Sequence, residues 1–293
     1  MHCFRMQARG SILFMTPRPI PGSKWLSVVP AVCALLLCAA PSTAIAAAPT
    51  SAAVAAFNSY VAGVETRLAR QHQSQDGFLP LPGSASQIEL RLRRGDSIIE
   101  RLTPSTSAEL PGALLHHWRG TAFVAGARAA DFERVMRDFN GYPHYFSPQV
   151  VQARVLAQQG DRMQAKMRVR QHHVIAVVMD ATCDIAFGRL DARHGYSISR
   201  STKVAEIDAA GTVEEHTLNA DQEHGFLWRL NTYWSYEERD GGLYLEIESV
   251  SLTRSIPRGL GCGAVFGERA ARVAGVYSAL RVQRDAQVVG LRH

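Results

Sequence analysis

The sequence predicts an α+β fold in which a curved antiparallel sheet of about seven strands wraps round a long C-terminal helix, with a short N-terminal helix and hairpin extension in front. One observation behind this is the alternation of apolar and polar residues that recurs between residues 115 and 252, which is typical of half-buried strands. Another is the helical spacing of apolar residues between 266 and 280. The composition, 46% hydrophobic and 20% charged over 293 residues, excludes a disordered or collagen-like chain.

The N-terminus has the pattern of an export signal. Residues 26–40 are apolar, follow Arg18 and Lys24, and precede the small residues 44–47, which suit a signal peptidase. This stretch is shorter than the ~20 residues that a membrane-spanning helix needs. We therefore expect residues 1–46 to be a cleaved signal peptide and the protein to be periplasmic or secreted. The alternative is an uncleaved N-terminal segment that anchors the protein and brings it into contact with the membrane.

The charge and the cysteine content of the mature chain limit the classes of partner and metal site that we expect. Four of the 32 basic residues and none of the 26 acidic ones precede residue 47, so the mature chain is almost neutral. We expect no nucleic-acid partner, because phosphate binding needs clustered basic residues. After removal of the signal only Cys183 and Cys262 remain, and they either form a disulfide after export or leave Cys183 as a small buried side chain. Two distant cysteines without a CxxC motif argue against zinc.

A helix and a hairpin are expected before the main domain. Residues 47–73 are rich in alanine and carry Phe57, Val61 and Leu68 at helical spacing. After a connector at 80–86, the apolar residues Ile88, Leu90 and Leu92 alternate with polar ones before the turn signal Gly95-Asp96, which predicts a small hairpin. We place a domain boundary after this extension, which spans residues 47–112, and assign residues 113–293 to the main domain.

The main domain opens with a strand expected at 115–124 and an amphipathic helix at 129–139. Pro143 and Pro148 limit residues 142–146 to a short turn of helix. Further strands are expected at 149–157, 162–170, 175–187, 196–207, 226–238 and 243–252. The long final helix is expected from the stripe Phe266, Ala270, Val273, Tyr277 and Leu280.

The alternation indicates a sheet with one wet face and one apolar face. Between Arg162 and Arg170, charged or amide side chains occupy every second position and apolar ones lie between them. In the strand expected at 226–238, Phe226, Trp228, Leu230, Trp234 and Tyr236 would form the apolar face. The long C-terminal helix is the natural partner for that face.

Four stretches of the sequence resemble a known superfamily. They are Asp138–Pro143, Gly225–Trp234, Glu237–Gly242 and Ser251–Pro257. On these the chain resembles, from about Leu114 to Arg284, an exported bacterial branch of the SRPBCC superfamily, which includes START-type lipid-transfer domains, birch-pollen-allergen-like proteins and polyketide cyclases. The resemblance implies a helix-grip fold with a cavity between sheet and final helix, and it does not imply chemistry.

Motifs for catalysis and metal binding are weak. The sequence contains no HExxH, GxSxG or phosphate-loop pattern. Adjacent residues on a strand point to opposite faces, so neither His116-His117 nor the pair at 172–173 can grip one metal ion from one side. We expect no metal and no cofactor. As acid or base in an enzyme, the candidates are His144, Tyr142 and Asp184, but no nucleophile, base and orienting group can be assembled.

Arg200 interrupts an apolar face of the strand at 196–207. A buried guanidinium is costly unless it is paired. Arg200 therefore meets a buried carboxylate, such as Asp180 or Asp184, or it binds the polar end of a ligand. A β-bulge that turns Arg200 outward is the other interpretation.

An aromatic set around the expected cavity completes the candidate ligand site. We expect the site residues to be Tyr142, Tyr145, Phe146, Arg200, Trp228, Trp234 and Tyr236. Ordinary core packing is the alternative interpretation of the aromatic residues. The first hypothesis is an exported carrier, not an enzyme, that encloses a small hydrophobic molecule, lipid-like or polycyclic. The alternatives are a cyclase- or hydrolase-type enzyme using the same cavity, and a cell-envelope interaction module with an exposed apolar patch on residues 50–105.

Overall fold

The computed structural model describes residues 48–81, 85–104, 109–110, 112–172 and 176–254, and these belong to one compact unit. The final helix expected at 266–280 and the signal segment 1–46 lie outside the described residues. Among the described residues, no helix combines the length and the apolar character needed to cross a membrane.

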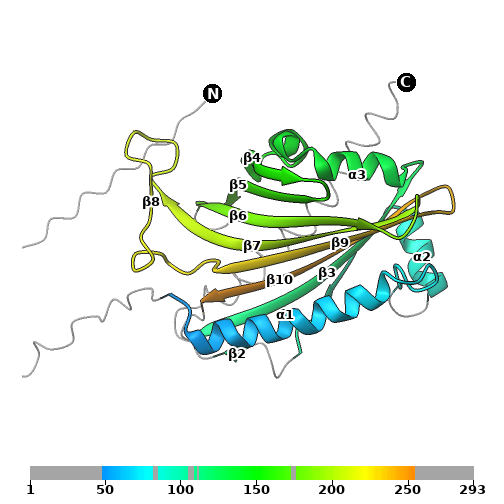
Figure 1. Ribbon diagram of the computed structural model, residues 1–293, viewed down its shortest axis with the longest axis horizontal. Helices are drawn as coiled ribbons and strands as arrows, with labels where there is room; N and C mark the ends of the chain where they lie inside the picture. The colour runs from blue at the N-terminus through cyan, green and yellow to red at the C-terminus, as the bar shows by residue number, and fades with distance from the viewer. Residues whose placement is uncertain (1–47, 82–84, 105–108, 111, 173–175, 255–293) are drawn as a thin grey trace, which may run out of the picture. The chain divides into compact units, whose positions relative to one another are not determined.

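One large antiparallel sheet dominates the fold (Figure 1). Its main path runs β1-β3-β10-β9-β7-β6-β5-β4, while β2 pairs with β3 and β8 pairs with β7. The two ends of the path, β1 and β4, do not pair, so the sheet is open. The strands are β1 (Ile98–Arg101), β2 (Glu109–Leu110), β3 (Ala113–Ala125), β4 (Val150–Gln159), β5 (Arg162–His172), β6 (Ala176–Arg189), β7 (His194–Asp208), β8 (His216–Thr217), β9 (Arg229–Arg239) and β10 (Gly242–Arg254). The α+β class and the seven long strands predicted from period-two alternation are confirmed.

Helices pack on both faces of this sheet. The helices are α1 (Ser51–Gln71), α2 (Ala85–Arg93), α3 (Ala129–Arg137), the 3-10 turn η1 (Phe139–Gly141) and α4 (Tyr142–Tyr145). Helix α1 begins where the Thr50 side chain accepts a hydrogen bond from the Ala53 backbone N–H, at 3.1 Å. We call the sheet face covered by α1 the outer face and the face covered by α3, η1 and α4 the inner face (Figure 1).

Each face has its own apolar core. On the outer face, Phe57, Val61 and Leu68 of α1 pack against side chains such as Tyr233 and Val250. The inner core is larger and joins the short helices to the centre of the sheet, with the buried members Phe132, Met136, Phe139, Tyr142, Phe146, Met163, Ala165, Ala181, Cys183, Ile185, Trp234, Tyr236, Leu243, Leu245 and Ile247 among others. The central strands are therefore buried on both sides, which a single wet face would not allow.

The segment expected as the first arm of a hairpin is helix α2 instead. Leu92 is fully buried, and Ile88, four residues earlier, packs against the same cluster, while Leu90 is 61% exposed. Over five residues, the positions i and i+4 of a helix coincide with period-two alternation, so the pattern did not distinguish the two. The Gly95 turn follows α2 and leads into β1, whose residues pair with Trp118–Thr121 of β3. The N-terminal extension is thus built into the sheet.

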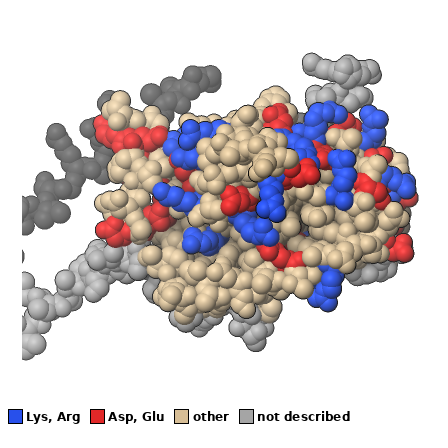
Figure 2. All heavy atoms as spheres, viewed as in Figure 1, with Lys and Arg blue, Asp and Glu red and all other residues tan. Residues whose placement is uncertain are grey.

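Charges on the molecular surface are mixed. On the face shown in Figure 2, basic and acidic side chains lie among one another rather than in separate patches. Ion pairs account for much of this mixing, for example Arg137 with Glu133 at 2.8 Å and Arg168 with Asp180 at 2.7 Å.

Candidate functional site

A cavity of about 130 Å³ lies on the inner face of the sheet, beneath η1 and α4. Most of the side chains around it are apolar. Its lining from the described residues is Met136, Phe139, Tyr142, Phe146, Gln149, Val150, Met167, Val169, Arg170, Gln171, Met179, Ala181, Ile185, Ser197, Ser199, Val204, Leu227, Leu230, Thr232, Trp234, Ile247 and Ser249. The site is thus formed by the six strands β4, β5, β6, β7, β9 and β10, the end of α3 and the short helical segment that follows it.

Local hydrogen bonds hold that helical segment over the cavity. The Asp138 side chain accepts from the Gly141 backbone N–H at 3.2 Å and from the Tyr145 hydroxyl at 2.8 Å, which caps η1 and ties α4 to it. Asn140 accepts from the Val155 backbone N–H at 3.0 Å, which fastens the segment to β4. These bonds explain why the sequence Asp138–Pro143 forms a compact turn rather than a continued helix.

Aromatic rings close this end of the cavity. Tyr142 lies between Phe139 and Phe146, with ring centroids 4.4 and 4.7 Å apart respectively. Its hydroxyl donates to the Met136 carbonyl oxygen at 3.1 Å, so the polar end of the buried ring is satisfied inside the protein. Burial raises the pKa of Tyr142 well above its ordinary value.

Five of the predicted site residues lie on the inner face. Tyr142, Phe146 and Trp234 line the cavity. Tyr145 and Tyr236 do not line it but pack against the same core. Phe132 of α3 makes edge contacts with both Trp234 and Tyr236, at centroid distances of 5.4 and 5.2 Å. For Trp234 and Tyr236, ordinary core packing is therefore part of the role of the side chain.

The expectation that Trp228 lines the cavity is corrected by the structure. Its indole is buried in the outer core with α1. The chain turns at Gly225, whose φ is +74°, and Trp228 precedes the first residue of β9. The period-two alternation of β9 therefore does not extend back to this residue.

Arg200 also lies away from the cavity. Its guanidinium donates to both carboxylate oxygens of Glu65 on α1, at 2.6 and 2.9 Å, and its side chain is 45% exposed. The carboxylate partner therefore comes from the N-terminal helix rather than from Asp180 or Asp184. Its neighbour on the same face, Ile198, packs against the outer core, so the apolar face that contains Arg200 is the one covered by α1. A register shift between β6 and β7 follows at Thr182/Cys183.

The candidate acids and bases do not converge in the cavity. His144 lies on α4 beside the Tyr145 ring, with centroids 5.5 Å apart, and is not part of the cavity lining. Asp184 accepts a hydrogen bond from Gln164 at 3.1 Å at an exposed position. Of the three candidates only Tyr142 borders the cavity, and its hydroxyl is already bonded to the backbone.

Cys183 is a free, buried thiol in the inner core. Burial raises its pKa to about 11, which keeps it protonated and unreactive at neutral pH. Cys262, the other half of the disulfide considered from sequence, lies outside the described residues. Within the part of the chain that the structure describes, no group of three or more His, Cys, Asp or Glu side chains could hold a metal ion.

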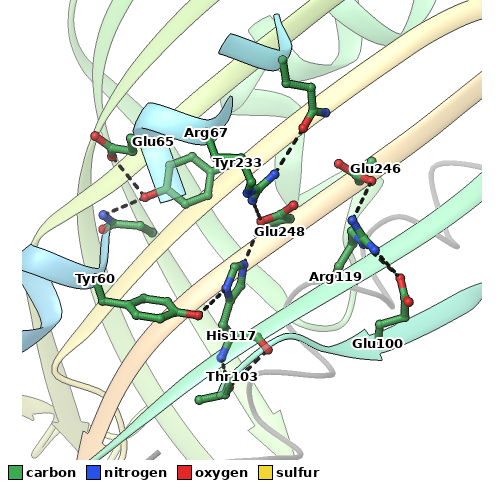
Figure 3. A network of polar contacts seen from close by, with 12 residues as sticks. Tyr60, Glu65, Arg67, Glu100, Thr103, His117, Arg119, Tyr233, Glu246 and Glu248 are labelled. Atoms are coloured by element: carbon green, nitrogen blue, oxygen red, sulfur yellow. Dashed lines mark hydrogen bonds and ion pairs between the residues drawn. The ribbon is translucent and has the colours of Figure 1, made fainter. Parts of the chain in front are cut away.

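A buried polar cluster lies between α1 and the outer face of the sheet (Figure 3). Glu248 is 1% exposed and accepts from Arg67 of α1, while His117 Nε2 lies 2.8 Å from the same oxygen. A carboxylate only accepts, so Nε2 carries a proton, and the Tyr60 hydroxyl lies 2.9 Å from Nδ1. Burial alone would raise the pKa of Glu248, but His117 and Arg67 outweigh it and the pKa is lowered.

Glu246 is the second carboxylate of this cluster and is poorly compensated. It is 1% exposed, and its nearest ion-pair partner, Arg119 Nη1, is 3.9 Å away. Arg119 makes a closer contact with Glu100, at 2.8 Å, as Figure 3 shows. Burial and the neighbouring Glu248 raise the pKa of Glu246 to about 7. The cluster links α1 to the sheet through a group that titrates near neutrality.

Sequence reasoning missed this cluster and the polar part of the cavity. His117 was considered as half of a histidine pair, and as predicted its neighbour His116 faces the opposite side, where it bonds Thr253 at 3.1 Å. The signal available for the cluster was Glu246 and Glu248, charged residues at every second position of a strand whose other face is apolar. That pattern indicates a solvated face, and only the packing of α1 reveals that it is buried.

The interaction-module hypothesis expected exposed apolar surface on residues 50–105. The apolar side of α1 is instead buried against the sheet. In the described part of that range the exposed large apolar side chains are Leu90 and Ile99.

Comparisons with known proteins found similar solved structures. No family model matches the sequence, and no curated protein matches it. Solved structures similar to it include a STAR-related lipid transfer protein from Xanthomonas axonopodis (TM-score 0.37, 16% identity, covering 62% of this chain and 98% of that one) and the Zhui aromatase/cyclase from a Streptomyces species (TM-score 0.40, 17% identity, 59% and 94%). A START superfamily protein from Mycobacterium smegmatis has TM-score 0.38 and 13% identity, covering 59% and 98%.

Proposed function

We propose that this protein binds a small hydrophobic molecule in the inner cavity and carries it without changing it chemically. The observation that carries the proposal is the cavity itself, a largely apolar space between the sheet and the short helices above it. Empty cavities of this kind are costly because their lining atoms lack contacts, and a hydrophobic ligand restores them. The lack of converging acid and base groups among the described lining residues favours a carrier over an enzyme.

The size of the cavity indicates the cross-section of the ligand. At about 130 Å³ it is close to the ~150 Å³ of an engineered apolar cavity that holds benzene. A single ring, or one ring or short chain of a larger molecule, therefore fits without rearrangement. Three methionines, Met136, Met167 and Met179, line the space, and their flexible side chains let the cavity adapt to longer or polycyclic molecules.

Apolar burial is the main source of affinity in this proposal. Each 100 Å² of ligand surface removed from water contributes roughly 2.5 kcal/mol, before the cost of immobilising the ligand. A one-ring molecule would bind weakly, and a larger lipid-like or polycyclic molecule that also covers neighbouring apolar surface would bind more tightly.

The test is native mass spectrometry of the protein produced in a bacterial host, followed by solvent extraction. We expect a reproducible adduct of small-molecule mass. The variant Ala181→Leu adds three carbon atoms to the cavity wall and should remove the adduct. The matched control Ala62→Leu makes the same change on the exposed side of α1 and should keep it.

Two outcomes would contradict the carrier function. One is a protein that has no adduct and gains none on incubation with lipid extract. The other is an adduct that persists in Ala181→Leu while circular dichroism shows that the variant is folded. Either result would contradict the proposal that the inner cavity binds the ligand.

We propose in addition that the protein is exported and that residues 1–46 are removed. The support is the basic, apolar and small-residue pattern of this segment. Fractionation of a bacterial host and N-terminal sequencing test it: a soluble envelope protein that begins near Ala47 is expected. An intact N-terminus in the membrane fraction would favour the anchored alternative, and a cytosolic intact chain would contradict export.

A further inference from the structure

The inner cavity contains a group of hydroxyls on its otherwise apolar floor. Thr232 of β9 lies directly opposite Ser249 of β10 and, on its other side, opposite Ser199 of β7. Opposite positions in an antiparallel pair have Cβ atoms about 4.5–5.5 Å apart. Ser197 lies two residues from Ser199 on the same strand face, and all four line the cavity.

Three of these hydroxyls have no hydrogen-bond partner in the described structure. Ser199 bonds the Cys183 thiol, whereas the side chains of Ser197, Thr232 and Ser249 make no side-chain hydrogen bond. Ser197 and Ser249 are 3% and 2% exposed and Thr232 is half-buried, and all three line the cavity. Buried hydroxyls are normally satisfied, and one left unpaired costs about 1–3 kcal/mol.

The surroundings of this group are apolar. Trp234 and Ile247 stand beside it on the same strands, and Met136, Phe139 and Phe146 line the remainder of the cavity. A plain hydrocarbon in this space would fill the volume but leave the three hydroxyls unpaired. Arg170 of β5 is the charged side chain among the described lining residues, and it lies outside the hydroxyl group. The hydroxyls themselves carry no charge, so the ligand group that complements them is neutral.

We propose that Ser197, Thr232 and Ser249 form a polar subsite for a neutral ring compound that carries hydroxyl or carbonyl oxygens on one edge. This inference rests on the proposed function and specifies the class of ligand. A hydroxyl can donate or accept, so the subsite serves both phenol-type and ketone-type oxygens. The rest of the ring contacts the methionine and aromatic side chains, which select for apolar surface.

Phenol and toluene are suitable probes, because they have nearly the same size and differ in a hydroxyl against a methyl group. Their affinities for the full-length chain are measured by calorimetric or NMR titration. The informative quantity is the ratio of the two affinities, since water hydrates phenol better than toluene. The double variant Thr232→Val/Ser249→Ala removes two hydroxyls while largely keeping side-chain volume.

We expect the double variant to lower the phenol-to-toluene affinity ratio about fivefold, the equivalent of one net neutral hydrogen bond. Toluene affinity should stay the same or rise. The control Thr202→Val makes the same chemical change at an exposed position of β7 and should leave the ratio unchanged. Because the removed hydroxyls are unpaired in the protein, the double variant should also unfold at the same or a higher denaturant concentration.

The outcomes separate this inference from the carrier function. If toluene binds but the ratio is the same in both proteins, the hydroxyl subsite is wrong while the apolar cavity remains. If neither compound binds, both the cavity's function and the subsite are contradicted.

Discussion

Replacing Glu246 by glutamine should remove part of the pH dependence of the free energy of unfolding. The Glu246 carboxylate is buried between α1 and the sheet, and Arg119 is 3.9 Å away, too far for a hydrogen bond. Burial and the charge of Glu248 therefore raise its pKa from 4.5 to about 7. Glutamine keeps the shape of the side chain and cannot ionise.

The sign and the magnitude follow from proton linkage. Between pH 4.5 and 7 the folded protein holds a proton on Glu246 that the unfolded chain has released, so the free energy of unfolding falls as pH rises through this window. Each pKa unit corresponds to about 1.36 kcal/mol, and the raised pKa of Glu246 therefore costs about 3 kcal/mol at pH 8. Glu246→Gln should regain that amount at pH 8 and little at pH 4.

Urea unfolding of both proteins at pH 4, 5, 6, 7 and 8 measures the effect. The difference in unfolding free energy, variant minus unaltered protein, isolates Glu246 because other titrating groups are common to both. We expect the difference to grow with pH and to level off above about pH 7. A difference that is constant across the series would refute the assignment of a raised pKa to this carboxylate.

Three further predictions concern the two ends of α1 and the helix α2. His72 is buried and stacks on Tyr196, and burial lowers its pKa to about 4. Relative to His72→Gln, the protein should gain up to about 3 kcal/mol of unfolding free energy as pH rises from about 4 to 6.5, measured by urea unfolding over the same pH series. A difference that does not change with pH would contradict this. Thr50→Ala removes the N-cap of α1 and should cost about 1 kcal/mol in urea unfolding, with Thr202→Val as an exposed control near zero; equal effects would argue against the cap. Leu92→Ala should cost about 2–5 kcal/mol and Leu90→Ala much less, because Leu92 is fully buried in the α2 core and Leu90 is 61% exposed; equal costs would favour the hairpin over the helix.

Alternation predicted the strands well because most of them carry long, regular patterns. Residues 162–170, for example, alternate without interruption, and they form β5 (Arg162–His172). The short segment around Leu90 was misassigned because five residues are too few to separate a period of two from one of 3.6. Whether this segment is helix or strand depends on the packing of Leu92 in a buried cluster, and such a tertiary contact is not visible in the local sequence pattern.

The site was harder to predict than the fold because both faces of the central strands are buried. Arg200 was assigned to the cavity on the assumption that one face of the sheet is wet, whereas α1 covers the outer face and supplies Glu65. Trp234 follows regular alternation and was placed correctly on the inner face. The hydroxyls of Thr232 and Ser249 look like ordinary strand residues in sequence, and only the register of β9 with β10 brings them together.

The most direct test of the central claim is to locate a bound ring compound by NMR in protein with ¹³C-labelled methionine methyl groups. Met136, Met167 and Met179 line the cavity, while Met163 lies in the same inner core without lining it. With toluene as the probe, intermolecular NOEs to the first three methyl groups, and none to Met163, are expected. NOEs that are absent at saturating toluene, or that appear at Met163 and not at the cavity methionines, would contradict a ligand cavity on the inner face.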